Sequence, residues 1–178
     1  DETMWKWAGL GLPHQSYVPR KPEPLGVESK TVADVESGIM LHIELQEGKY
    51  RMEAAEYTED YQHTTACTLR CLEPWFKTHA VVIGDSWFAS VQTACALVSK
   101  GLNFIGNVKT ASKMFPKKWL SEKLKDSSRG TSVYVASTVP ADTFKNDEDV
   151  RLIAYLPVFL SVAVKLPVVP SPAPPKPP

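Results

Sequence analysis

Asp85 is the residue whose setting points most directly to chemistry, because it stands between an apolar strand pattern and a helical pattern. The run 80–84, AVVIG, predicts a short strand buried on both faces, and helical spacing starts at Ser90. In an open α/β sheet, groups at the carboxyl end of such a strand lie in the functional crevice. A carboxylate there needs solvent or a partner, and its oxygens suit Mg²⁺ or Mn²⁺. Alternatively, Asp85 simply caps the helix that follows.

Two of the three cysteines also have a spacing that could place metal ligands together. Cys67 and Cys71 are four residues apart in a helical pattern, so their thiols lie on adjacent turns. A zinc site would need two more ligands, and none are near in sequence, so we expect structural thiols. The four histidines show no ligand spacing. The small, odd number of cysteines indicates reduced thiols in an intracellular protein.

The charge of the chain is divided, although 20 basic and 20 acidic side chains cancel. Residues 28–60 carry nine acidic side chains, and residues 100–125 carry seven lysines. Both regions could simply be solvated faces, or the lysines could form a cationic strip that contacts phosphates. An aromatic residue within a basic run is typical of nucleic-acid grooves, although an amphipathic surface helix has the same pattern. The predicted DNA contacts are Lys109, Lys113, Lys117, Lys118 and Trp119.

The elements expected to position these residues make a mixed α/β domain. Residues 13–26 are dense in proline and predict an extended connector. A hairpin of strands is expected over 27–33 and 39–47, and a helix capped by Thr64 or Thr65 should end at Pro74. The remaining predicted elements are a helix from Ser90 to Gly101, strands at 102–108, 131–136 and 150–155, and a short helix at 117–125.

The last segment, 156–178, differs in kind because it holds eight of the 15 prolines. We expect it to be disordered or in polyproline II conformation, unable to pair in a sheet. Such a tail is either inert or bound by a polyproline-recognising domain. A length of 178 residues suits one domain, and no apolar run is long enough to cross a bilayer, so no membrane association is expected.

Two segments of the sequence resemble the piggyBac-type transposase domain. Asp1-Glu2, followed by the run 17–26, YVPRKPEPLG, is similar to the DE dipeptide and the P-x-KP…G segment of that family. The run 84–90, GDSWFAS, looks like its D-N-W/F-F-T/S-S element, and Leu97, Gly101 and Gly106 also fit. The resemblance covers residues 1–155.

This resemblance implies a ribonuclease-H-like DDE/D fold, in which a mixed sheet flanked by helices carries the metal-binding carboxylates. Asp1 matches the first acidic position of the family and Asp85 the second, so both are expected to be catalytic and to bind Mg²⁺ or Mn²⁺. The implied activity is DNA cleavage and strand transfer, in which two metal ions stabilise the attacking and leaving oxygens. The implied partner is transposon-end DNA, with a possible homodimer and a nuclear location.

The sequence departs from the family pattern at both ends. Asp1 is the first residue, so the strand that should carry it lacks its front half, and the third acidic position has no counterpart. The acidic residues near the carboxyl end are expected to be solvated loop charges: Asp142, Asp147, Glu148 and Asp149. We therefore expect a domain truncated at both ends, spanning 1–155, whose catalytic activity is incomplete. The alternatives are a non-catalytic DNA-binding or protein-interaction module, or a decayed mobile-element fragment.

Overall fold

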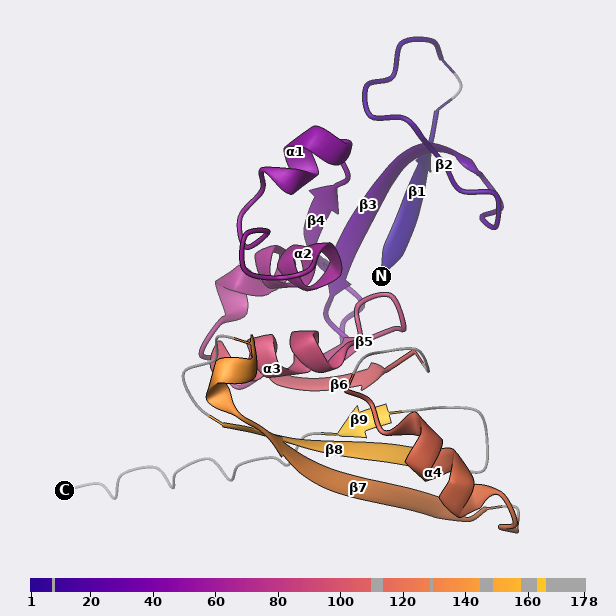
Figure 1. Cartoon of the computed structure of the whole chain (residues 1–178). Helices are drawn as coiled ribbons and strands as arrows, with labels where there is room; N and C mark the ends of the chain where they lie inside the picture. The colour runs from indigo at the N-terminus through magenta and orange to yellow at the C-terminus, as the bar shows by residue number, and fades with distance from the viewer. Residues whose placement is uncertain (8, 110–113, 129, 145–148, 158–162, 166–178) are drawn as a thin grey trace, which may run out of the picture.

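The chain folds as two β-sheets with helices packed between and against them (Figure 1). This computed structural model describes residues 1–7, 9–109, 114–128, 130–144, 149–157 and 163–165. The first sheet contains β1 (Glu2–Lys6), β2 (Ser16–Tyr17), β3 (Leu25–Ala33) and β4 (Met40–Leu45). The second has the strand order β5-β6-β9-β8-β7. Its strands are β5 (Val81–Gly84), β6 (Asn103–Asn107), β7 (Ser132–Val139), β8 (Val150–Pro157) and β9 (Ala163–Lys165).

Strand β3 organises the first sheet, because β1 pairs with it on one side and β2 and β4 pair with it on the other. All of these pairings are antiparallel. The predicted β3–β4 hairpin is confirmed, and Gly38 in its turn adopts a φ of 70°, which favours glycine. Strand β2 lies within the connector expected at 13–26. In β1, Glu2 lies directly opposite Lys30.

Of the first two helices, the sequence predicted only the second. Helix α1 (Lys49–Glu53) lies in a polar stretch for which we predicted no element. Helix α2 (His63–Leu72) passes into the 3₁₀ helix η1 (Glu73–Trp75), so the predicted end at Pro74 is confirmed. The predicted threonine cap is wrong: Gln62 is the N-cap residue. Thr65 is instead fully buried, and its hydroxyl bonds the hydroxyl of Thr93 at 2.8 Å, because this face of α2 packs on the next helix.

That next helix, α3 (Val91–Ser99), connects β5 to the parallel strand β6 and forms the centre of the core. Ser90 caps it by accepting a hydrogen bond from the Thr93 N–H at 3.0 Å. Gly101 ends it with a φ of 73°, as predicted. Leu97 and Phe104 are fully buried in this core. Helix α4 (Lys117–Leu124) packs against β7, and a 3₁₀ helix, η2 (Ala141–Phe144), separates β7 from β8. None of the described helices is long and apolar enough to cross a bilayer.

Strand β5 is not buried on both faces, which corrects the prediction from its apolar sequence. Val81 is 49% exposed and Ile83 is 64% exposed. The reason is that β5 is the edge of its sheet and, in the described part of the chain, pairs with β6 alone. A continuous apolar run shows that a strand can be buried, but only its neighbours decide whether it is.

The segment after residue 155 contains strand structure, which contradicts the expectation that it cannot pair in a sheet. Strand β8 continues to Pro157, and β9 lies between β6 and β8, pairing antiparallel with both. The short apolar stretch before the densest prolines is what makes this pairing possible. The proline-rich residues 166–178 lie outside the described residues, so the expectation for them stays a prediction.

Candidate functional site

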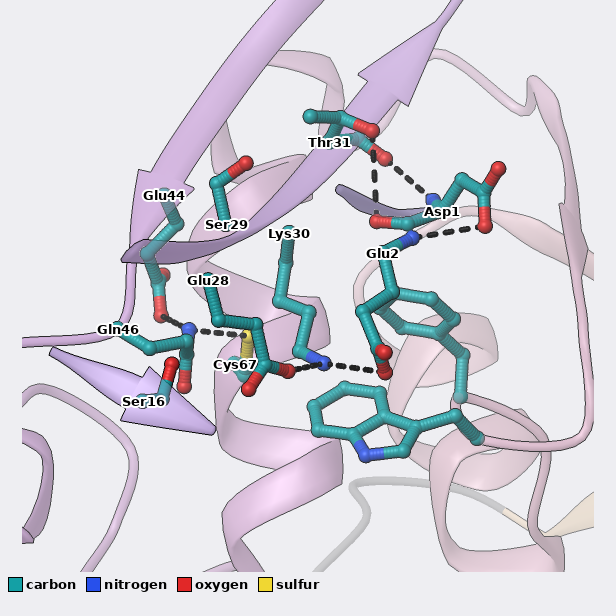
Figure 2. Close-up of polar contacts among 12 residues, drawn as sticks. Asp1, Glu2, Ser16, Glu28, Ser29, Lys30, Thr31, Glu44, Gln46 and Cys67 are labelled. Atoms are coloured by element: carbon teal, nitrogen blue, oxygen red, sulfur yellow. Dashed lines mark hydrogen bonds and ion pairs between the residues drawn. The ribbon is translucent and has the colours of Figure 1, made fainter. Parts of the chain in front are cut away.

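A buried lysine connects the two acidic motifs of the sequence. The Lys30 side chain is only 1% exposed, and its ammonium donates to Glu2 Oε2 at 3.1 Å and to Glu28. Its Nζ also lies 3.7 Å from the centre of the Trp87 ring, a cation–π contact. Figure 2 shows the ammonium between the two carboxylates. Lys30 therefore ties β1, through Glu2, to the turn that follows Asp85, through Trp87.

Glu2 is held by cations from the proline-rich connector as well. Arg20 and Lys21 lie 3.0 and 3.3 Å from its Oε1, and Lys21 also donates to the Glu2 carbonyl at 2.9 Å. Burial alone would raise the pKa of Glu2, but the hydrogen bonds and charges of Lys30 and Lys21 outweigh it and lower the pKa. The two parts of the first family motif, Asp1-Glu2 and Arg20-Lys21, thus meet at the Glu2 carboxylate.

Asp1 lies beside Thr31 and precedes β1. Its amino nitrogen donates to the Thr31 carbonyl at 2.6 Å, and its carbonyl accepts from the Thr31 N–H at 2.8 Å. Side chains alternate along a strand, so the Asp1 carboxylate points away from the Lys30 side of the sheet (Figure 2). It is exposed, and its Oδ1 accepts the Glu2 N–H at 2.7 Å. Asp1 is thereby fixed through its backbone, and its carboxylate stays accessible.

Asp85 follows β5 directly and organises the turn before α3. Its Oδ1 accepts the N–H groups of Trp87 at 2.8 Å and of Phe88 at 3.4 Å. The helix cap is Ser90, so the alternative that Asp85 is simply the N-cap of α3 is wrong. Asp85 is exposed, and its Oδ2 makes no hydrogen bond with the residues that the structure describes. That oxygen is available to a ligand.

The fold brings Asp1 and Asp85 into one electrostatic environment. Burial lowers the pKa of the Asp1 α-ammonium, and the Asp85 carboxylate acts in the opposite direction. In Figure 1 the amino terminus lies beside β5, although 84 positions separate the two aspartates in the sequence. Two carboxylates with exposed oxygens are the hard donors that Mg²⁺ and Mn²⁺ prefer, so the donor chemistry of the pair fits such an ion.

No third carboxylate of the described ranges joins this pair as a metal-binding group. Asp149 instead accepts the Ala141 N–H at 3.0 Å and so supports η2, and Asp142 is exposed within that 3₁₀ helix. The predictions for Asp147 and Glu148 fall outside the described residues.

A groove separates β5 from the end of β3. It has a volume of about 560 Å³ and is lined by Asp1, by Val32 and Ala33 of β3, and by Val81 and Ile83 of β5. Along this edge of β3, backbone pairing reaches only as far as Thr31. Thr31 pairs with Asp1, the residue that precedes β1. The edges of the two sheets thus face each other across the groove.

Of the residues predicted to contact DNA, Lys118 and Trp119 lie on α4, and Lys109 follows β6. Lys109, Lys118 and Trp119 are exposed. Lys123, which the prediction omitted, places its ammonium 5.7 Å from the centre of the Trp119 ring; its spacing of four residues on a helix was the available signal. Lys113 and the side chain of Lys117 lie outside the described residues. The described part of this basic region is therefore the exposed Trp119 with Lys118 and Lys123 beside it.

Comparison with known proteins assigns the chain to a family. The family model described as Transposase IS4 matches residues 1–154, and the chain belongs to this piggyBac-type transposase family. A solved structure with a similar fold is the cryo-EM structure of a piggyBac transposase synaptic complex with hairpin DNA. The TM-score is 0.67 at 19% sequence identity, and the match covers 93% of this chain and 32% of that one. The chain therefore spans about a third of the length of that transposase. None of the curated proteins matches it.

The contacts of Glu2 predict a particular dependence of stability on pH. Because the folded state lowers the pKa of Glu2, the ionised side chain stabilises the fold at neutral pH. This stabilisation is lost as the pH falls below 4.5, the ordinary value for glutamate, and through the lower folded value. We expect Glu2→Gln to lower the free energy of unfolding by about 2 kcal/mol at neutral pH and by progressively less in acid. Urea unfolding at a series of pH values measures this.

Glu23→Gln is the matched control. The Glu23 side chain pairs with Lys6 at 2.9 Å but is 52% exposed, so its loss should cost less than about 1 kcal/mol. An equal loss of unfolding free energy in the two variants would contradict the conclusion that the Glu2 contacts stabilise the fold more than a surface ion pair does.

Proposed function

We propose that this chain is a transposase-derived domain that binds DNA at the start of β1 and at the turn after β5. The observation that carries the proposal is the linkage through Lys30, which holds the two family motifs together and leaves both aspartates exposed. The ancestral activity would be metal-dependent cleavage and strand transfer of DNA. Membership of the piggyBac-type family supports that activity, and a nuclear location and a homodimer are further parts of the proposal.

Each residue of the site would have a definite role. Asp1 and Asp85 would hold Mg²⁺ or Mn²⁺, which when bound would polarise a DNA phosphodiester and neutralise the charge that develops on its oxygens. The turn from Asp85 to Phe88 fixes the direction of the Asp85 carboxylate. Glu2 is already engaged by three cations, so it orients Asp1 and takes no direct part.

We further propose that the complete sheet is ribonuclease-H-like, with one strand joining the two sheets. A strand that continues β1 on the amino side of Asp1 would pair with Val32 and Ala33 on one side and with β5 on the other. The support is the groove between these edges and the exposure of Val81 and Ile83, whose burial such a strand would complete.

Extending the chain tests this arrangement. An extension of about five alternating Val and Thr residues before Asp1, enough to span β5, should protect the amides of β5 from hydrogen exchange. It should also raise the free energy of unfolding by roughly 2 kcal/mol, because apolar surface is buried. An extension with Pro at alternate positions cannot pair and should do neither. If both extensions behave alike, the groove does not accept a strand.

The basic residues around α4 would contact the DNA backbone, with Trp119 stacking on bases. If so, removing the exposed lysines Lys118 and Lys123 should reduce the slope of log affinity against log salt by about 0.9 for each lost phosphate contact on duplex DNA. Trp119→Ala should weaken binding to single strands by about 1–3 kcal/mol. Fluorescence anisotropy with labelled oligonucleotides across a salt series measures both effects.

Lys49→Ala provides a matched control, because that side chain is 79% exposed and lies on α1, in the other half of the fold. A change of slope in this variant as large as in the α4 variants would argue against a localised interface.

Cleavage by the purified chain should be absent, because the described residues supply two carboxylates and no third. We expect no nicking of supercoiled plasmid in Mg²⁺ or Mn²⁺, measured by gel electrophoresis. Robust nicking that is abolished by Asp85→Ala and retained in Asp142→Ala, which removes an exposed aspartate from η2, would show that the site is complete.

The second candidate function is a DNA-binding module without catalysis. The observation that favours it is the exposed Trp119 and Lys123 pair, which needs no metal to contact DNA. Salt-dependent binding that is insensitive to Asp85→Ala but weakened at Lys118 would distinguish it. The proline-rich tail as a ligand of a polyproline-recognising domain, and the chain as a decayed element, stay as predictions.

A further inference from the structure

Three potential metal ligands converge where α2 packs against β4. Cys67 and Cys71 come from successive turns of α2, and Glu44 comes from β4. One ligand atom of each lies within 4.8 Å of the others. Cys67 is fully buried, Cys71 is 2% exposed, and the Glu44 side chain is 14% exposed.

We propose that Glu44, Cys67 and Cys71 form a binding site for Zn²⁺ that is separate from the two aspartates. Thiolate sulfur and carboxylate oxygen are both zinc ligands, and sulfur selects zinc over Mg²⁺. With Zn–S bonds of about 2.3 Å, tetrahedral ligands lie about 3.8 Å apart. The spacing of the three ligand atoms fits this geometry with sub-ångström side-chain adjustments.

Arg70 orients the carboxylate of this site and does not replace the metal. It donates from Nε to Glu44 Oε2 at 3.0 Å and from Nη2 to Oε1 at 2.8 Å. Each carboxylate oxygen has two lone pairs, so Glu44 can accept from Arg70 and still bind a cation. Ligating carboxylates in zinc sites are usually held by such outer hydrogen bonds.

The charges of the group also balance with a divalent ion present. Two thiolates and one carboxylate carry three negative charges, which Arg70 and Zn²⁺ together neutralise. The Gln46 amide, which lies between Glu44 and Cys67 in Figure 2, is 4.0 Å from the Cys67 sulfur and can donate to it. A thiolate accepts such a bond better than a thiol does.

Without the ion, Cys67 stays protonated. The adjacent Cys71 and burial, with Glu44 adding to them, strongly raise the pKa of the Cys67 thiol. Zinc binding at neutral pH must therefore release the proton of the Cys67 thiol. Cys71 lines the groove between β3 and β5, which gives an ion a route to the site and a solvent molecule access to the fourth position.

Cobalt titration of the whole chain tests the site, because tetrahedral cobalt bound by thiolate has intense sulfur-to-metal absorption. We expect this absorption on adding Co²⁺, its loss on adding Zn²⁺, and proton release measured with a weakly buffered indicator. Cys71→Ser should reduce the affinity for Co²⁺ at least about tenfold and diminish the sulfur absorption. Cys95→Ser is the matched control, since Cys95 is an equally buried cysteine on α3, outside the cluster, and should leave the spectrum unchanged.

Two results would overturn the proposal: a native chain without sulfur-to-cobalt absorption, or absorption that survives in Cys67→Ser and Cys71→Ser alike. Asp85→Ala should not affect cobalt binding, so failure of the zinc site and failure of the DNA-cleavage proposal are separable. Circular dichroism of each variant distinguishes loss of ligand from loss of fold; in a variant that does not fold, the native titration and its zinc competition decide the outcome.

Discussion

The buried ammonium of Lys30 is the interaction on which the arrangement of the site depends. A charge that is 1% exposed is costly unless it is paired, so folding must bring opposite charge and polarisable groups to it. Glu2, Glu28 and the ring of Trp87 meet that need. Because Glu2 adjoins Asp1, and Trp87 lies two residues after Asp85, pairing one lysine also positions both aspartates. The site is thus specified by a neighbour that takes no part in its chemistry.

A second constraint comes from the edges of the two sheets, where unpaired backbone N–H and C=O groups must be covered or exposed to solvent. Helix α2 contacts β3, β4 and α3, and so connects the sheets on one side. On the other side, β5 presents Val81 and Ile83 to the groove. The same groove adjoins Asp1 and Cys71, so its state affects both the proposed DNA site and the proposed zinc site.

These two sites differ in the hardness of their donors. Asp1 and Asp85 offer exposed oxygens, suited to an ion that keeps its water and contacts phosphate. Glu44 and the two cysteines offer buried sulfur and a carboxylate held by Arg70, suited to a softer ion such as Zn²⁺. Soft and hard donors select different cations, so the two proposals are independent in chemistry although one groove adjoins both sites.

Local patterns in the sequence determined the hairpin, the start of helical spacing at Ser90, the stop at Gly101 and the place of Asp85 directly after a strand, because each depends on residues close together in the chain. Those patterns could not place the edge of the second sheet, the pairing of β9, or the exposure of β5, since these depend on strands distant in sequence. Spacing along the chain likewise showed no further ligand near Cys67 and Cys71, whereas the fold brings Glu44 to them across the packing of α2 on β4. The residue types available to each site were set by the sequence, and only tertiary packing decided which of them meet, because burial and charge pairing act between segments far apart in the chain.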